Sequence, residues 1–150
     1  MQVSFVTEIL QRIAPEFGAA VEMEPAWGYA GRVVFPDGRA MRFVGTHCDA
    51  NPLGAAALVN DKAYAKHFLR AAGLPVPEGE AFFSRAWERE VGSDRTPDAA
   101  LAYAARVGFP VFVKPNALRA GIGVHCVGSP TGFADAVRRI TRRDRVFLVE

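Results

Sequence analysis

The sequence predicts a mixed α/β protein. Along the last two thirds of the chain, helix signals alternate with short β-rich runs, and proline or glycine separates most of them. Half of the 150 residues are hydrophobic, 23% are charged and the mean hydropathy is +0.07. This balance excludes a disordered chain, and the length fits one domain with at most a small appendage.

Three helices are predicted after residue 58, and each begins at a residue that caps helices well. They cover 61–72, 96–108 and the segment that opens at 129–131. Gly73 and Gly108 stop the first two. In the third, Phe133, Val137 and Ile140 recur at helical spacing, which predicts one buried face.

Four runs rich in valine and phenylalanine predict strands. They lie near 80–84, 110–115, 123–127 and 145–150. Residues 116–121 between two of them have the composition of a loop, and the polar segment 85–95 predicts a loop or a short helix.

The first 58 residues differ from the rest in composition. A helix is predicted within 3–17, with Phe5, Ile9, Ile13 and Phe17 on one stripe and an interruption near Pro15. Two β-like runs then flank Pro36-Asp37-Gly38, which indicates a hairpin. A soft boundary is expected at 51–54.

The segment most suggestive of function joins two predicted strands. Lys114 stands at the end of the first strand, and Gly121-Ile122-Gly123 precedes the second. Backbone N–H groups of such a loop can approach phosphate oxygens closely, and the lysine adds a positive charge. The segment matches neither a Walker A loop nor a dinucleotide fingerprint. An ordinary hairpin with a solvated lysine is the alternative.

Four features occur in order after residue 58. They are Asp61-Lys62 opening a helix that ends LRAAGLPVPEG, the run RVGFPVFVKP, the loop with GIGV, and the final VFLVE. This ordered set resembles the front half of an ATP-grasp protein of the carboxylate–amine ligase type, close to cyanophycin synthetase-like and glutathione synthetase-like proteins. The resemblance implies a mostly antiparallel sheet with two helices on one face. The expected regions are a mixed leader over 1–58, a helix and connector over 59–95, and a first ATP-grasp subdomain over 96–150.

The resemblance also implies a nucleotide site. Lys62 would reach the nucleotide phosphates, Lys114 would contact the phosphate and adenine side of ATP, and Glu150 would begin the hinge beside adenine. The loop from Asn116 would close over the phosphates. The residues implied to bind the nucleotide are Lys62, Lys114, Asn116, Gly121, Ile122, Gly123, Val124 and Glu150.

The implied function is the ATP-binding part of a ligase that phosphorylates a carboxylate and then joins it to an amine or a thiol. ATP and Mg²⁺ are the implied cofactors, and small-molecule or peptide carboxylates and amines the implied substrates. The metal ligands of the family lie downstream of the hinge, so they are expected beyond residue 150. The chain is therefore expected to be truncated and inactive alone, although its parent would be an enzyme. A non-catalytic module that binds nucleotides or polyanions is the alternative.

Other segments bear on location, metal binding and polyanion binding. No run approaches the ~18 apolar residues of a membrane span, and the start of the chain lacks the pattern of a signal peptide. A cytoplasmic protein is therefore expected, and a homo-oligomer is one expected state. His47-Cys48 and His125-Cys126 suggest zinc ligands. However, adjacent strand residues point to opposite faces, so neither pair would offer both of its side chains to one metal ion.

A last group of side chains carries the strongest positive charge: Arg138, Arg139, Arg142, Arg143 and Arg145. It predicts a polyanion site or a solvated helix face, and without interleaved aromatic residues no nucleic acid partner is expected.

Overall fold

The fold is described from a computed structural model, which covers residues 4–150. The first three residues of the predicted leader lie outside this description. The chain divides into two compact units, Met1–Ala55 and Ala56–Glu150, which are described separately below.

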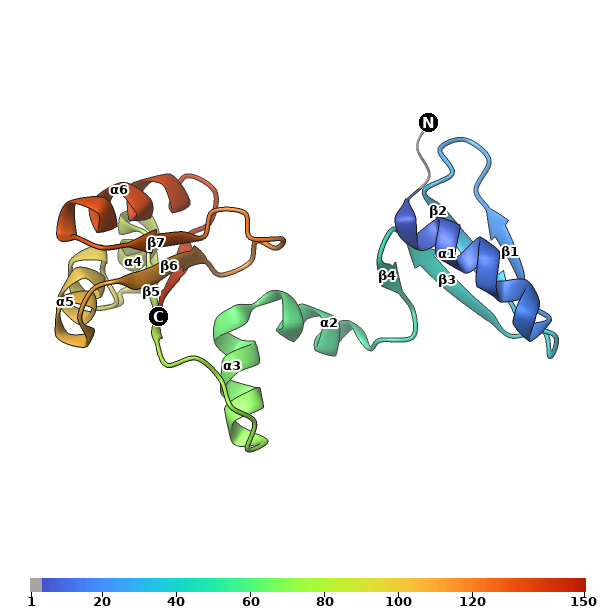
Figure 1. The fold of residues 1–150 in the computed structure, drawn as a ribbon, viewed down its shortest axis with the longest axis horizontal. Helices are drawn as coiled ribbons and strands as arrows, with labels where there is room; N and C mark the ends of the chain where they lie inside the picture. The colour runs from blue at the N-terminus through green and yellow to red at the C-terminus, as the bar shows by residue number, and fades with distance from the viewer. Residues whose placement is uncertain (1–3) are drawn as a thin grey trace. The chain divides into compact units, whose positions relative to one another are not determined.

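The first unit is a four-stranded antiparallel sheet preceded by a helix (Figure 1). Its elements are α1 (Phe5–Ile13), the 3₁₀-helix η1 (Ala14–Phe17), β1 (Ala20–Met23), β2 (Ala30–Val34), β3 (Ala40–Val44) and β4 (His47–Cys48). The predicted hairpin is the pair β2–β3, and β1 and β4 extend it on either side.

The predicted apolar stripe of α1 is wrong at both of its ends. The side chains of Phe5 and Phe17 are 75% and 69% exposed, whereas Thr7 and Ala14 are buried. The Ser4 hydroxyl caps the helix by accepting the Thr7 N–H, and the two hydroxyls also share a hydrogen bond of 2.9 Å, so that a buried threonine is satisfied. The 3₁₀ turn that follows has three residues per turn, which rotates Phe17 out of the helical stripe.

The second unit contains the other helices and a second four-stranded sheet. Its elements, with α2 crossing the division between the units, are α2 (Leu53–Asn60), α3 (Lys62–Ala71), β5 (Glu80–Phe83), α4 (Arg85–Val91), α5 (Pro97–Val107), β6 (Val111–Pro115), β7 (His125–Val127), α6 (Pro130–Ile140) and β8 (Val146–Val149). The strand order is β5-β8-β6-β7, and every neighbouring pair is antiparallel.

Local sequence explains where these helices begin. Each of α3, α4, α5 and α6 has an N-cap side chain that accepts the backbone N–H three residues later. The N-cap residues are Asp61, Ser84, Thr96 and Ser129. The polar segment after Ser84 is thus a short helix, which Gly92 ends in the left-handed conformation.

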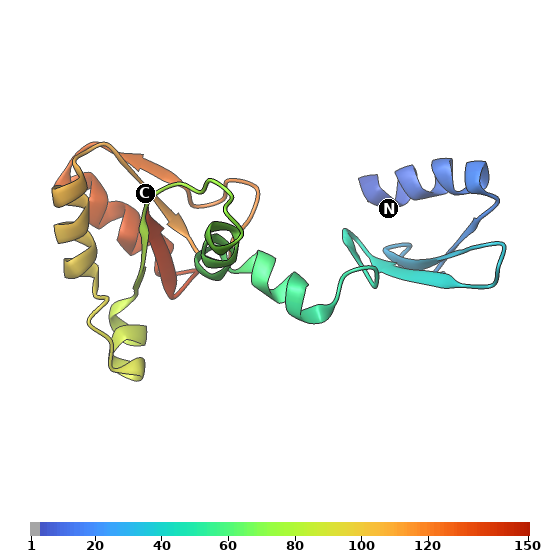
Figure 2. The same cartoon turned by 90° about the horizontal axis from the view of Figure 1, so that it is seen from below.

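The two faces of the second sheet have different roles. Helices α5 and α6 cover one face, and Val111, Val113 and Phe147 are buried there among helix residues such as Phe133 (Figures 1 and 2). Because strand residues alternate between faces, Lys114 lies on the opposite face, and so does Glu150, which pairs with Phe112. The predicted fold class, an antiparallel sheet with helices on one face, is confirmed.

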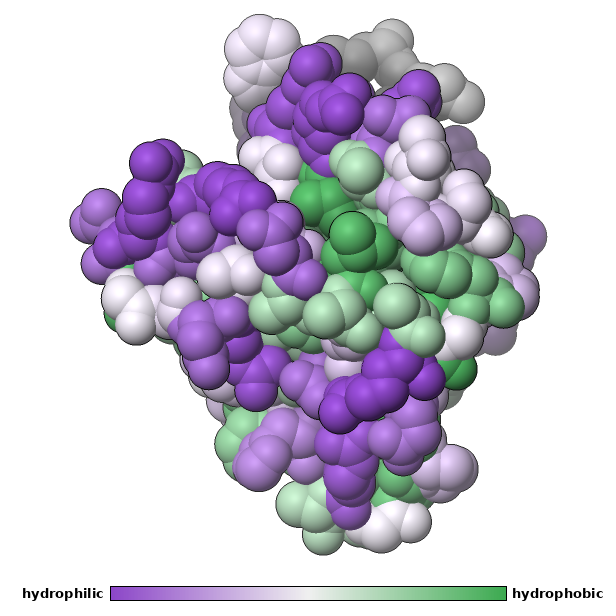
Figure 3. Space-filling view, turned by 90° about the vertical axis from the view of Figure 1, so that its left-hand side faces the viewer, coloured by the Kyte–Doolittle hydropathy of each residue, from purple (hydrophilic) through white to green (hydrophobic). Residues whose placement is uncertain are grey.

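Apolar side chains also reach the surface of the molecule. On the face shown in Figure 3, hydrophobic residues lie between patches of hydrophilic ones. Among residues 4–150, no helix is long and apolar enough to span a membrane.

Candidate functional site

The site forms where β6 and β8 end side by side. Lys114 Nζ lies 2.5 Å from Glu150 Oε2. The Glu150 backbone continues the β8 ladder, since its N–H donates to Phe112 O at 2.9 Å. Gly79 leaves room for this carboxylate: a Cβ there would meet Glu150 Cγ at 2.6 Å and collide with the Val149 carbonyl. The absence of a side chain at Gly79 therefore helps to place Glu150.

A second lysine reaches the same carboxylate from α3. Lys66 Nζ lies 2.8 Å from Glu150 Oε1, and these two side chains are only 11% and 9% exposed. Burial is the largest influence on Glu150 and raises its pKa, but hydrogen bonds and charge from Lys114 and Lys66 outweigh it, so the net pKa is lowered. Glu150 is therefore held as a carboxylate between two ammonium groups.

Lys62 lies one helical turn before Lys66 and faces the loop after β6. Its Nζ donates to the carbonyl of Asn116 at 2.9 Å and also to that of Leu118. Burial lowers the pKa of Lys62, and the positive charge of Lys114 lowers it further. The ammonium group is thus bound by neutral carbonyls beside a like charge.

Asn116 ties the loop to the start of α3. Its side chain is buried, its Oδ1 accepts the Ala63 N–H at 3.0 Å, and its Nδ2 donates to Asp61 Oδ2 at 2.7 Å. The Asn116 carbonyl also accepts the Lys62 N–H at 3.3 Å. The side-chain amide of Asn116 thus forms its hydrogen bonds with the first residues of α3 and with the residue that caps it. The contact with a nucleotide that was implied for Asn116 remains a prediction.

The structure does not bring the rest of the predicted loop to the lysines. Gly121 and Gly123 have φ values of 74° and 75°, which favour glycine, and a Cβ at Gly123 would come within 3.0 Å of Pro115 Cγ. Ile122 and Val124 are partly exposed. Within residues 4–150, no hydrogen bond joins these four residues to Lys62, Lys114 or Glu150.

Sequence reasoning missed Lys66 and Asp61. The signal for Lys66 was its spacing, because a residue four places after Lys62 lies on the same helix face. The sequence contains only three lysines, and all three meet here. We call Lys62, Lys66 and Lys114 with Glu150 the lysine cluster.

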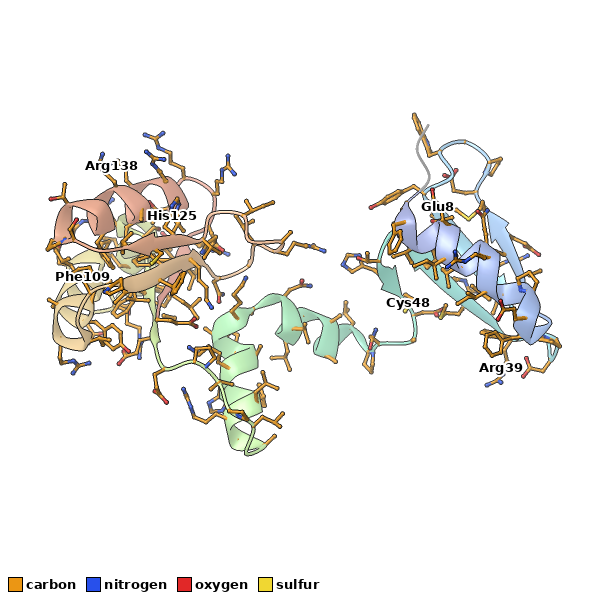
Figure 4. The ribbon with its side chains drawn as sticks, in the orientation of Figure 1. Glu8, Arg39, Cys48, Phe109, His125 and Arg138 are labelled. Carbon is orange, nitrogen blue, oxygen red and sulfur yellow. The ribbon has the colours of Figure 1, made fainter. Side chains whose placement is uncertain are left out.

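No group of three or more His, Cys, Asp or Glu side chains between residues 4 and 150 is arranged to hold a metal ion. Of the two His-Cys pairs, Cys48 lies on β4 in the first unit and His125 on β7 in the second (Figure 4).

Comparison with protein families identifies the class. A family model described as the C-terminus of D-Ala–D-Ala ligases matches residues 68–150, which is more than half of the chain. With the fold above, this match confirms the resemblance to ATP-grasp carboxylate–amine ligases. Within that class, the chain belongs to the D-alanine–D-alanine ligase family.

Curated relatives agree with this family. The D-alanine–D-alanine ligase of Deinococcus radiodurans is 36% identical over 98 residues, which are 65% of this chain and 27% of that protein. The ligase of Chlorobium luteolum is 31% identical over 146 residues, which are 87% of this chain and 39% of that protein. The chain thus spans well under half the length of these relatives.

Solved structures show the same fold. The VanG D-Ala:D-Ser ligase of Enterococcus faecalis is 25% identical with a TM-score of 0.52, over 64% of this chain and 25% of that one. The D-alanine–D-alanine ligase of Helicobacter pylori is 18% identical with a TM-score of 0.50, over 65% and 26% respectively.

Proposed function

We propose that this chain supplies the first half of a nucleotide site in an ATP-dependent ligase that joins the carboxylate of D-alanine to the amine of a second D-amino acid. The observation that carries the proposal is the lysine cluster, in which every lysine of the sequence meets at the ends of β6, β8 and α3. The substrate class comes from the names of the relatives, D-alanine–D-alanine ligases and a D-Ala:D-Ser ligase.

The residues present fit a triphosphate. The cluster holds three ammonium groups and one carboxylate, and the Lys62 ammonium group donates to two backbone carbonyl oxygens. Since burial and Lys114 lower the pKa of Lys62, a phosphate oxygen would favour its charged form and offset both effects. When bound, ATP would supply the phosphoryl group that activates the carboxylate.

Each member of the cluster has a separate task in this proposal. Lys62 and Lys114 bind the phosphates through their compact positive charges. Because the fold already holds both side chains in place, little rearrangement is needed when the phosphates bind. Lys66 does not need to touch the nucleotide, because its contact with Glu150 positions that carboxylate at the start of the hinge. Residues 116–124 would cover the phosphates and exclude water. Mg²⁺ bound to the phosphates would help to neutralise their charge.

Titration of the 150-residue chain with Mg·ATP tests the proposal. Replacing Lys114 by alanine should weaken ATP binding by about tenfold or more, because a charge-assisted contact is lost. Arg39→Ala is a control, since Arg39 pairs with Asp37 in a surface turn of the first unit. Absence of ATP binding, or equal affinity in Lys114→Ala, would contradict the proposal.

The lysine content allows a second, independent readout. An acetylating reagent can modify only three side-chain amines, all of them in the cluster. Mg·ATP should slow the acetylation of Lys62 and Lys114, as measured by peptide mass spectrometry, while the α-amino group reacts at an unchanged rate. The alternative of a binding module without turnover uses the same cluster, so ATP binding does not separate it from a ligase. D-alanine-dependent release of phosphate by a chimera, in which the remaining part of the Deinococcus radiodurans ligase follows residue 150, would distinguish the two. A homo-oligomeric state and a cytoplasmic location remain predictions.

A further inference from the structure

A second concentration of positive charge lies on the other side of the sheet. There a cavity of about 350 Å³ opens between the end of α6 and the loop that joins β6 to β7. Its lining residues are Pro115, Leu118, Gly123, His125, Arg139, Ile140, Arg142 and Arg143. We call it the arginine cavity. Its volume lies within the ~300–1,000 Å³ that is usual for small-molecule sites.

The three arginines of this cavity have no internal partner. Among residues 4–150, the guanidinium groups of Arg139, Arg142 and Arg143 form neither an ion pair nor a side-chain hydrogen bond. By contrast, Arg138 on the same helix pairs with Asp135 at 3.1 Å. Three unpartnered like charges around one hollow repel one another, and an anion would relieve that repulsion.

Neighbouring carboxylates do not supply this anion. Asp144 directly follows Arg143, but its carboxylate accepts the N–H groups of Ala117 at 2.7 Å and of Val146 at 3.1 Å. The α6 macrodipole favours positive charge in the last helical turn and so accounts for Arg139. It does not account for Arg142 and Arg143, which lie beyond the helix end.

The arginine cavity is separate from the lysine cluster. Pro115 lines the cavity, whereas Lys114, its neighbour on β6, points to the opposite face of the sheet. The two sites meet at the loop after β6. Leu118 of this loop lines the cavity, and its carbonyl oxygen accepts a hydrogen bond from Lys62 Nζ. A ligand in the cavity would therefore lie behind the loop and not in the nucleotide site.

We propose that the arginine cavity binds a small phosphorylated molecule. Guanidinium groups match the geometry of phosphate and can bind it through two parallel hydrogen bonds. Pro115, Leu118 and Ile140 give the cavity an apolar wall on which the carbon part of such a molecule can pack. Nucleic acid is the less suitable occupant, because none of the lining residues is a phenylalanine, tyrosine or tryptophan, and His125 is the one ring among them that could stack on a base.

Calorimetric titration with inorganic phosphate and with glycerol 3-phosphate tests this site. The titrations use the 150-residue chain carrying Lys114→Ala, so that the proposed nucleotide site contributes less. Binding should be saturable, tighter for glycerol 3-phosphate, and weakened by about tenfold for each of Arg142→Gln and Arg143→Gln. Arg138→Gln is the matched control on the same helix and should bind both probes unchanged.

Three results would overturn the proposal. They are equal affinity in the Arg142→Gln and Arg138→Gln variants, no saturable binding of either probe, or binding of duplex DNA alone with a steep salt dependence. Since these arginines are exposed and unpaired, unchanged circular dichroism of each variant is expected. Amide NMR shifts at Gly123 and His125 on addition of glycerol 3-phosphate give a second readout. Loss of ATP binding in Lys114→Ala, with phosphate binding kept, would uphold both this site and the proposed function.

Discussion

Each unit of the chain contains a four-stranded antiparallel sheet, but the ion pairs beside the two sheets differ in how far they are buried. On the first sheet, Arg32 and Glu22 pair at 2.7 Å with each side chain 53% exposed. Beside the second sheet, Lys66 and Glu150 pair at 2.8 Å with side chains 11% and 9% exposed. Nearly equal distances therefore describe two different interactions, because water screens the first pair and is largely excluded from the second.

The choice of cation follows the same division. The first unit contains arginines but no lysine, while every lysine of the sequence lies in the second unit, around Glu150 and the loop after β6. An ammonium group is a compact charge that can exchange one oxygen for another. A surface pair needs no such property, but the proposed phosphate site does. Burial and excess charge, more than ion pairing itself, therefore separate the lysine cluster from the pairs of the first unit.

The largest effect is expected when the buried carboxylate is neutralised. Glu150→Gln leaves Lys66 and Lys114 with an uncharged partner, and it should lower the free energy of unfolding by about 3 kcal/mol. Urea denaturation followed by circular dichroism measures this change. If the loss were below about 0.5 kcal/mol, the two ion pairs would be equivalent to surface pairs and the contrast between the units would fail.

The same carboxylate should make stability depend on pH. Its folded-state pKa lies below the ordinary 4.5, so its stabilising contribution is complete above pH 4.5 and is lost as the pH falls through the lower folded value. The stability difference between the natural sequence and Glu150→Gln should therefore be full at about pH 6 and should shrink towards about pH 3. Denaturation curves at both pH values measure it. A difference that grows on acidification would reverse the assigned direction of the pKa shift.

A smaller effect is expected where the loop is tied to α3. Asn116→Ala removes the acceptor of the Ala63 N–H and the donor to Asp61, at a cost of about 2 kcal/mol. Faster amide hydrogen exchange at Ala63 would locate the loss. Asn60→Ala is the control, because the exposed Asn60 amide donates to the Ala56 carbonyl within α2. In this variant the Ala63 amide hydrogen should exchange at the same rate as in the natural sequence.

The smallest effect is expected on the first sheet. Glu22→Gln breaks the exposed pair with Arg32 and should change the free energy of unfolding by less than about 0.5 kcal/mol. The substitution is chemically the same as in Glu150→Gln, so the ratio of the two losses measures the difference in burial directly. A cost comparable to that of Glu150→Gln would show that exposure does not separate the two pairs.

Much of the second unit could be predicted because its signals are local. Asp61, Thr96 and Ser129 cap helices through hydrogen bonds that span three residues, and such signals are complete in the sequence. The orientation of α1 could not be predicted in this way. Phe5 and Phe17 follow helical spacing yet remain exposed, since the turn at η1 and the packing of the sheet select another face.

The site was predictable in part for the same reason. Lys62, Lys114 and Glu150 stood in recognisable motifs. By contrast, the contact of Lys66 with Glu150 and that of Asp61 with Asn116 arise only because α3 lies beside the ends of β6 and β8. Whether Gly121 to Val124 close over a nucleotide depends on a bound ligand, so their sequence pattern alone does not position them at the lysines.

The sequence by itself determined the class of ATP-grasp carboxylate–amine ligases, the starts of α3, α5 and α6, the four strands of the second sheet and three of the four members of the lysine cluster. These depend on cap residues, residue spacing and an ordered set of short motifs. Only the tertiary structure decided that Lys66 and Lys114 converge on one buried carboxylate while Lys62 binds the carbonyls of the neighbouring loop, and that the unpaired arginines border a cavity on the opposite face. The physical reason is that burial and charge balance arise from segments far apart in the sequence, which only folding brings together.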